Sequence, residues 1–175
     1  MGRSNAYWAG NRYPDGSLAP LPEAPLQDLP PAPAARFGLL RSGLLAIDDV
    51  VEVVRFMGAT WRWAWEYGMG NRKLCWLHVV GNELSATFTV SELEEDRLRK
   101  GGRVPAGLLR ALEQGQKTGP VKWCWLELDD RRAVDSFIRL ARRKAEWLAE
   151  RPVTHRKTRA RAQPAAAEDD ANEAE

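Results

Sequence analysis

Apolar and polar residues alternate along the middle of the chain, and this period of two is typical of β-strands buried on one face. The pattern is clearest after Gly81-Asn82, where apolar residues at 84, 86, 88 and 90 alternate with Ser and Thr. Gly-Asn is a two-residue hairpin signal, and the run 74–80 before it is apolar almost throughout. We therefore predict a β-hairpin over 74–90 whose first strand is buried on both faces.

A row of aromatic residues precedes this hairpin. Its members stand two positions apart, so a strand would place every ring on one face of the sheet: Trp61, Trp63, Trp65 and Tyr67. Apolar residues at helical spacing upstream could continue into the row and make it helical instead. We prefer a strand because the aromatic residues largely alternate with smaller or polar ones and are favoured in strands. The turn sequence 68–71 then leads into the hairpin, which gives a three-stranded meander.

Helical periodicity lies on both sides of the meander. Apolar residues at 50, 53, 54 and 57 follow a candidate N-cap, Asp48, and predict a helix over 47–57. After the meander, residues 91–94 match a capping box and predict a short helix that ends at the glycines 101 and 102, and Pro105 begins another. A long helix follows Asp129 or Asp130, with one apolar side. That side consists of Val134, Phe137, Ile138, Ala141, Ala145 and Leu148.

One late strand completes the predicted sheet. The run 121–128 carries Trp123 and Trp125 at strand spacing, after the helix-breaking pair Gly119-Pro120. The elements then follow the order α-β-β-β-α-α-β-α. This order predicts an α+β domain with a four-stranded, mainly antiparallel sheet, a meander plus one late strand, packed with an N-terminal and a long C-terminal helix.

The two ends of the chain differ in composition from the predicted domain. Residues 1–33 contain seven prolines, which predicts a disordered proline-rich leader over 1–37. Residues 151–175 contain a single large aliphatic residue and read first basic and then acidic, which predicts a disordered tail. The remaining 38–150 is enough for a single α+β domain.

Targeting segments and cysteines indicate the compartment of the protein and its expected partners. We see no signal peptide and no apolar run long enough to span a bilayer, and Cys75 and Cys124 lie inside apolar runs as free buried cysteines do. These features predict a cytoplasmic protein that makes no membrane contact, as a monomer or homodimer. We expect an unknown small molecule or protein as its partner, and no cofactor.

The aromatic residues are the candidate ligand-binding site. A row of rings is either the floor of a core or the lining of a site, and the sequence leaves both interpretations open. A site of this kind would suit a flat organic ligand or a cation held against the ring faces. The candidate residues are Trp61, Trp63, Trp65, Tyr67, Trp76 and Trp123.

Other polar groups suggest chemistry less directly. Cys75, His78 and Cys124 could bind a metal, but the odd spacing of Cys75 and His78 places them on opposite faces of a strand, so we predict no metal site. Acidic residues at 92, 94, 95 and 96 fit the favourable charge of a helix start. The chain contains no Ser-His-Asp order, P-loop or HExxH motif, so no motif supports an enzyme, and we favour a non-catalytic protein while the question of activity stays open.

A basic surface supports an alternative function. Three arginines align opposite the apolar side of the last helix, and the tail continues with more basic residues. Together they could contact phosphates, in a salt-sensitive way. The residues are Arg132, Arg139, Arg143, Arg156, Lys157, Arg159 and Arg161.

Three segments resemble an uncharacterised bacterial family of small proteins, domain-of-unknown-function family three-seven-eight-eight. They are the lead into a Tyr-Gly turn at 65–68, the hairpin 74–90, and the late strand 122–126 followed by a helix. The resemblance covers about 44–148 and implies a compact α+β protein with no agreed activity. The function we expect is therefore that of an uncharacterised bacterial, non-catalytic domain that binds a ligand or partner through an aromatic sheet face, with nucleic-acid association as the alternative.

Overall fold

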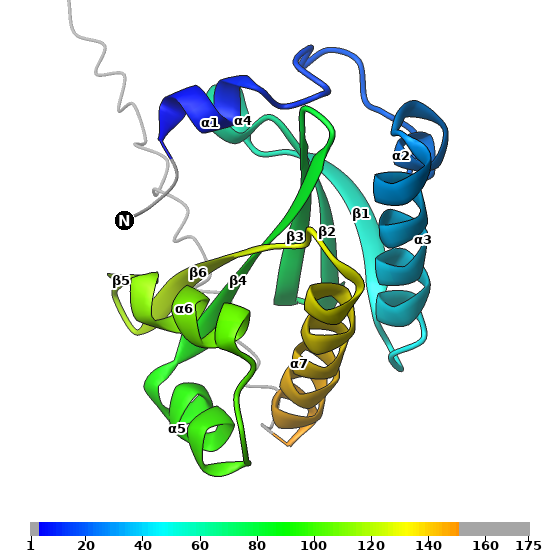
Figure 1. Cartoon of the computed structure of the whole chain (residues 1–175). Helices are drawn as coiled ribbons and strands as arrows, with labels where there is room; N and C mark the ends of the chain where they lie inside the picture. Colours follow the sequence, from blue (N-terminus) through cyan, green and yellow to red (C-terminus); the bar gives the residue numbers. More distant parts are fainter. Residues whose placement is uncertain (1–3, 151–175) are drawn as a thin grey trace, which may run out of the picture.

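The structure is a computed structural model that describes residues 4–150, and its centre is a six-stranded sheet (Figure 1). Neighbouring strands are all antiparallel, in the order β1-β2-β3-β4-β6-β5. The strands are β1 (Val51–Phe56), β2 (Trp63–Met69), β3 (Arg72–Val80), β4 (Glu83–Ser91), β5 (Gln116–Thr118) and β6 (Val121–Glu127).

Helices cover this sheet at its sides and at one end. Figure 1 shows α7 lying across the sheet between α3 and α6, while α1 and α4 lie together at the upper end. None of the helices within residues 4–150 is long and apolar enough to cross a membrane. The helices are α1 (Asn5–Ala9), α2 (Ala24–Asp28), α3 (Pro31–Leu45), α4 (Gly58–Trp61), α5 (Glu92–Lys100), α6 (Ala106–Gln114) and α7 (Arg131–Ala149).

The hairpin and the last helix match the prediction. Strands β3 and β4 pair in register around Gly81-Asn82, and Gly81 has the positive φ of 60° that such a turn requires. Helix α5 begins with the predicted capping box, in which the Ser91 hydroxyl accepts from the amide of Glu94. Helix α7 is capped by Asp130, whose carboxylate accepts a hydrogen bond from the amide of Ala133 at 2.7 Å.

The prediction of a four-stranded sheet was wrong, because two edge strands were missed. The segment predicted as a helix over 47–57 is largely β1, in which Val54 pairs with Trp65 of β2. Its valines are β-branched and so fit a strand, and Asp49 just before it has a φ of 61°, which a helix does not allow. Strand β5 has three exposed residues, too few to show a period in the sequence.

The N-terminal segment is also different from the predicted disordered leader. Its prolines begin helices instead of preventing them: α3 starts at Pro31, where the missing amide hydrogen costs no bond. Phe37, Leu40 and Leu44 of α3 are fully buried, and Trp8 of α1 is 2% exposed. The predicted tail 151–175 lies outside the described residues.

The main core lies between one face of the sheet and helices α3, α6 and α7. Trp65 and Tyr67 of β2 project into it, as do Phe88 of β4 and Phe137 of α7, whose ring centroids lie 5.8 Å apart. Burial of rings of this size is the main favourable contribution to folding. Because the main core fills one face of the sheet, a binding site on the sheet would lie on the opposite face.

Candidate functional site

A second set of aromatic side chains occupies the sheet face opposite the main core. Glu66, Trp76, Thr87 and Trp125 are register partners on neighbouring strands, so their side chains share this face. Helices α1 and α4 cover its upper end with Trp8 and Trp61. We call this surface the aromatic face, and it consists of Trp8, Trp61, Trp76, His78, Trp123 and Trp125.

Four tryptophans of the aromatic face form a continuous chain of ring contacts. Trp8 stacks on Trp61 with ring centroids 5.7 Å apart, and Trp61 meets the edge of Trp123 at 5.7 Å. Trp123 in turn stacks on Trp76 at 5.3 Å, with an angle of 24° between the ring planes. Such offset stacks and edge-on contacts are the preferred arrangements of aromatic pairs, so these contacts are favourable.

His78 is buried at one end of this chain, with its ring centroid 4.8 Å from that of Trp8 and 6.3 Å from that of Trp61. Its Nε2 lies 3.0 Å from the hydroxyl oxygen of Thr87, while its Nδ1 has no hydrogen-bond partner among residues 4–150. Burial lowers the pKa of His78 to about 3, because removal from water disfavours the charged imidazolium. His78 is therefore neutral at physiological pH.

Glu66 ends the chain of rings on the other side. Its carboxylate accepts the indole N–H of Trp76 at 2.9 Å and forms ion pairs with Lys73 at 2.5 Å and Arg55 at 3.1 Å. Burial raises the pKa of Glu66, but the hydrogen bonds from Lys73, Trp76 and Arg55 outweigh it, so the pKa lies below its usual value. The carboxylate is charged and fully occupied.

The structure divides the predicted ligand-binding residues between the two faces. Trp61, Trp76 and Trp123 belong to the aromatic face, whereas Trp65 and Tyr67 are in the main core. Trp63 is two residues before Trp65 in β2, so its side chain lies on the same face of the sheet. Both indoles donate to backbone carbonyls of the N-terminal segment, Trp63 to Asp15 at 2.7 Å and Trp65 to Pro22 at 2.8 Å.

The predicted single row breaks at Arg62. This residue has a φ of 59°, in the left-handed region, and it separates α4 from β2. The alternation of a strand therefore does not extend back to Trp61, whose ring turns to the opposite face. A positive φ at an arginine has no sequence signal, so spacing alone could not reveal this.

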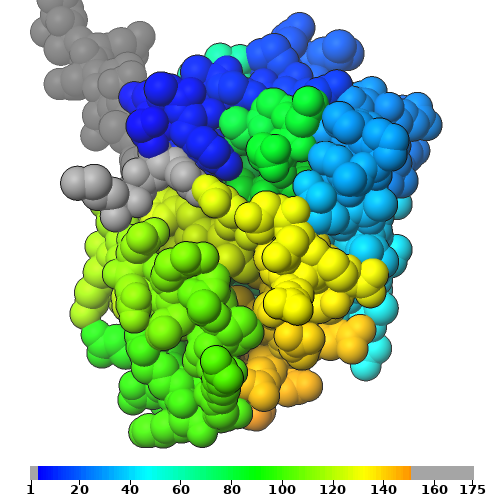
Figure 2. All heavy atoms as spheres, in the orientation of Figure 1, coloured from blue at the N-terminus to red at the C-terminus, as the bar shows by residue number. Residues whose placement is uncertain are grey.

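A cleft of about 1050 Å³ opens beside the aromatic face, where β6 meets the starts of α6 and α7. Figure 2 shows this side of the molecule, with α6 in green and the start of α7 in yellow. We call it the edge cleft. Its lining includes Tyr7, Gly107, Arg110, Gln114, Trp125, Leu126, Glu127, Asp129, Asp130, Arg132 and Ser136.

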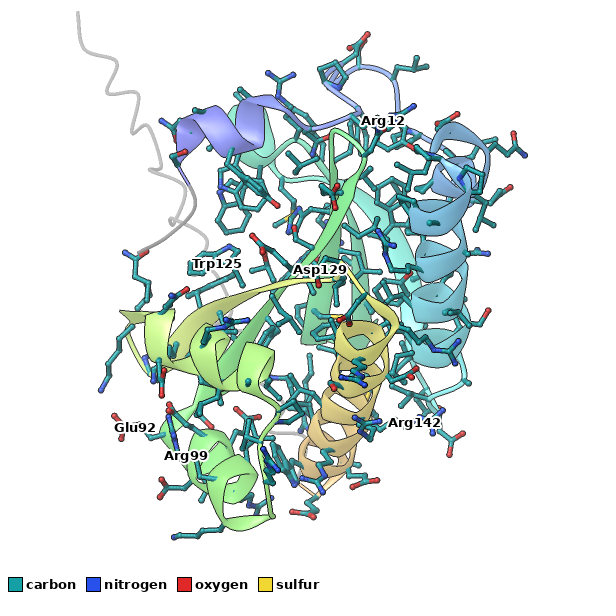
Figure 3. All side chains as sticks on the ribbon, in the orientation of Figure 1. Arg12, Glu92, Arg99, Trp125, Asp129 and Arg142 are labelled. Carbon is teal, nitrogen blue, oxygen red and sulfur yellow. The ribbon has the colours of Figure 1, made fainter. Side chains whose placement is uncertain are left out.

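Trp125 connects the edge cleft to the aromatic face. It shares the face of Trp76 and Thr87 by strand register, and it lines the cleft (Figure 3). Its indole nitrogen is buried, yet it has no hydrogen-bond partner among the described residues. A buried N–H without an acceptor costs about 1–3 kcal/mol, and an occupant with a carbonyl or carboxylate oxygen would recover part of this.

Charges of both signs line the edge cleft. Arg110 projects from α6 and Arg132 from the first turn of α7, and no carboxylate lies within ion-pair distance of either in residues 4–150. Asp130 is held as the cap of α7. On the next turn the Ser136 hydroxyl accepts from Arg139 at 3.1 Å. The cleft thus presents two arginines and an indole donor together with the carboxylates of Glu127, Asp129 and Asp130.

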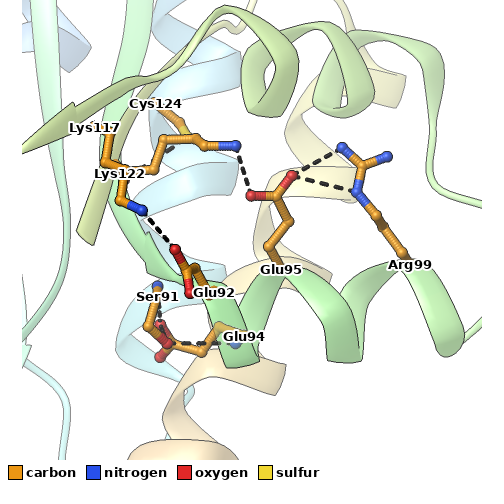
Figure 4. Close-up of polar contacts among 8 residues, drawn as sticks. All are labelled: Ser91, Glu92, Glu94, Glu95, Arg99, Lys117, Lys122 and Cys124. Carbon is orange, nitrogen blue, oxygen red and sulfur yellow. Dashed lines mark hydrogen bonds and ion pairs between the residues drawn. The ribbon is translucent and has the colours of Figure 1, made fainter. Parts of the chain in front are cut away.

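The other candidate groups of the sequence have structural partners. Figure 4 shows the acidic residues of α5: Glu92 pairs with Lys117 at 2.5 Å and Glu95 with Lys122 at 2.6 Å, which ties α5 to the β5–β6 hairpin. Glu94 completes the capping box by accepting from the backbone amide of Ser91 at 2.6 Å. These carboxylates therefore hold the fold together.

The structure separates the predicted metal candidates and places three of the predicted phosphate contacts on α7. Cys75 and Cys124 lie in the main core, and His78 lies on the aromatic face. Cys75 and His78 therefore point to opposite faces of β3, as their odd spacing predicts. Burial raises the pKa of both thiols to about 12. Arg132, Arg139 and Arg143 are exposed along α7. The basic tail residues Arg156, Lys157, Arg159 and Arg161 lie outside the described residues.

Sequence reasoning missed the edge cleft. The only signal for it is Trp125, placed two residues after Trp123, together with Gly119-Pro120, which ends the preceding strand early. Comparisons add no further guide: no protein-family model matches the chain, and neither a curated protein nor a solved structure is similar to it. The resemblance to the uncharacterised bacterial family stays a prediction.

Proposed function

We propose that this protein is a non-catalytic binding domain whose occupant enters the edge cleft and contacts the aromatic face through Trp125. The observation that carries the proposal is a cleft of about 1050 Å³ with a buried, unpartnered indole N–H in its wall. Binding pockets in proteins are concave, hold several hundred cubic ångströms and combine apolar walls with a few placed polar groups. The edge cleft has this size, and its lining combines apolar residues such as Leu108 and Leu126 with a larger share of polar and charged groups.

The titratable groups nearby support binding over catalysis. An acid or base needs a pKa near the working pH and access to the substrate. His78 is buried and neutral, and the Glu66 carboxylate is occupied by three donors. Both thiols are buried in the main core with raised pKa values. The groups that remain in the cleft are donors and acceptors suited to orienting an occupant.

A screen of small aromatic acids and amides by ligand-observed NMR tests the proposal. We expect compounds that bind the full-length protein and lose roughly five-fold or more in affinity in Trp125→Phe, which keeps a ring and removes the N–H donor. Trp147→Phe is the matched control, because Trp147 lies near the other end of α7, beside Arg97. A screen without binders, or binders that respond equally to both substitutions, would contradict the proposal.

Nucleic-acid association is a second candidate, favoured by one observation. Arg132, Arg139 and Arg143 are exposed on α7, and no carboxylate pairs with them in the described part of the chain. If all three contacted phosphates, the slope of log K against log salt would be steeper by about 3 than in a triple glutamine variant. Fluorescence anisotropy with a labelled DNA duplex measures both slopes. Equal slopes would exclude this role for the helix.

A further inference from the structure

The large exposed apolar side chains gather on the side of the molecule that residues 18–56 form. This side ends in β1, an edge strand of the sheet that lies beside α3, with β5 at the opposite edge (Figure 1). Within residues 4–150, Leu93 is the one such side chain outside this region. The others are Leu18, Leu21, Leu26, Leu39, Leu45, Val51, Val53 and Phe56. Apolar residues gathered on one side of a surface are typical of a protein–protein interface.

The outer backbone edge of β1 has no strand beside it among residues 4–150. Its inner side pairs with β2 in a regular antiparallel register, which the amide of Met57 continues by donating to the carbonyl of Arg62. Because hydrogen-bonded and non-hydrogen-bonded pairs alternate, the odd-numbered residues of 51–57 bond to β2. The N–H and C=O groups of residues 52, 54 and 56 therefore point outward.

The side chains of β1 leave this edge open to pairing. Val51 and Val53 are 60% and 42% exposed. Strand edges are usually protected by lysine, proline, a bulge or a covering element, since they otherwise pair with other chains. Strand β5 at the opposite edge contains Lys117, whereas β1 contains neither lysine nor proline. Its one basic residue, Arg55, is paired with Glu66 at 3.1 Å.

We propose that the protein forms a homodimer in which β1 pairs antiparallel with β1 of a second copy, about a twofold axis at Val53. Opposite residues of an antiparallel pair share a face, so a twofold axis brings one residue opposite itself. An axis at Glu52 would place two carboxylates together. An axis at Val54 would extend the pairing to Phe56, whose ring already packs against Gly16 and Trp63. An axis at Val53 brings two exposed valines into contact.

Charges at the two ends of β1 fit a second copy in this arrangement. Asp48 and Asp49 are exposed and come directly before the strand, whereas Arg55 lies near its other end. Antiparallel pairing therefore places the acidic start of each strand beside the basic end of the other, and complementary charges of this kind favour one register over others. The edge cleft adjoins β6, away from β1, so it stays accessible in both copies.

Analytical ultracentrifugation of the full-length protein between about 1 and 500 µM tests the dimer. We expect the mass to rise with concentration from 19.7 kDa toward twice this value. Val53→Lys should raise the dissociation constant roughly ten-fold or more, because it removes the apolar contact and places two positive charges opposite each other. Leu93→Lys is the matched control on α5 and should change it less than about two-fold. A mass that stays at 19.7 kDa, or equal effects of the two substitutions, would overturn the proposal.

Val53→Cys tests the register. Residue 53 bonds to β2, so its pair across the axis is non-hydrogen-bonded, with Cα atoms about 4.5 Å apart, which a disulfide can span. Mild oxidation should therefore cross-link this variant, since the natural cysteines Cys75 and Cys124 are buried. Val51→Cys is the control: residue 51 is more exposed but lies about 13 Å along the strands from its copy, so it should not cross-link. Equal cross-linking of both variants, or of neither, would overturn the proposed pairing.

Discussion

Burial of His78 makes the stability of the domain depend on pH in a way that one substitution can isolate. The native pKa of about 3 lies far below the ordinary 6.5, because burial between aromatic rings disfavours the imidazolium. On acidification the unfolded chain therefore binds a proton from about pH 6.5 downward, whereas the folded protein does not. The free energy of unfolding falls with pH in this range, since protons stabilise only the unfolded state.

The magnitude follows from the two pKa values. The stabilisation is fully present above pH 6.5 and is lost as the pH falls toward 3. Each pH unit in between costs about 1.4 kcal/mol, so at pH 4.5 the loss from this residue is about 2.7 kcal/mol. His78→Gln has a side-chain amide that reaches toward Thr87 and does not titrate, so this loss should be absent in the variant.

Urea unfolding followed by circular dichroism at pH 7.5, 6.5, 5.5 and 4.5 measures the effect in both proteins. Titration of carboxylates is common to both, so the difference between their free energies of unfolding isolates His78. We expect this difference to change by about 2–3 kcal/mol in favour of the variant between pH 7.5 and 4.5. Parallel profiles would refute the reasoning, because they would mean that His78 takes up its proton in the folded protein.

Three further predictions follow from the burial and partners of single residues. Trp65→Ala should lower the free energy of unfolding, measured with urea, by about 3–5 kcal/mol, and Trp61→Ala should lower it by less, because Trp65 is fully buried and Trp61 is half-buried. Equal losses would contradict the assignment of the two residues to different faces. Glu66→Gln should lower the free energy of unfolding by about 1–2 kcal/mol at pH 7. This loss should shrink as the pH falls below 4.5, the ordinary pKa of a glutamate, because the lowered pKa of Glu66 means that it stabilises the fold only while it is charged. A loss that does not depend on pH would argue against its ion pairs. Cys75 and Cys124 should react with a thiol reagent at pH 8 only at the rate at which the domain unfolds, because burial raises the pKa of both thiols to about 12. Rapid labelling of the folded protein would contradict their place in the main core.

Local signals in the sequence were sufficient where one short segment determines the structure. The capping box at Ser91, the cap at Asp130 and the turn at Gly81 all act within a few residues, and each lies where it was predicted. The hairpin of β3 and β4 followed from such signals together with alternation. Spacing also separated Cys75 from His78, because the side-chain period of a strand is strict.

Elsewhere the outcome depends on contacts that the sequence does not reveal. The prolines of the N-terminal segment begin helices because Phe37, Leu40 and Leu44 find a sheet to pack against. Spacing could not show that Arg62 would divide the aromatic row between two faces. The edge cleft exists because β5 has only three residues, while α6 and α7 begin beside residues 125–127 of β6. Each of these is a tertiary arrangement, which overrides local preference.

The most direct test of binding at the edge cleft uses the indole N–H signals of the tryptophans in a 15N-labelled protein. The indoles of Trp63 and Trp65 are internal controls, because they donate to the carbonyls of Asp15 and Pro22, away from the cleft. During titration with the tightest compound from the ligand-observed screen we predict a saturating shift of the Trp125 indole signal, whose N–H has no partner within residues 4–150 in the free protein, while the two control signals stay in place. A Trp125 signal that does not move, or that moves together with both controls, would contradict binding at the edge cleft.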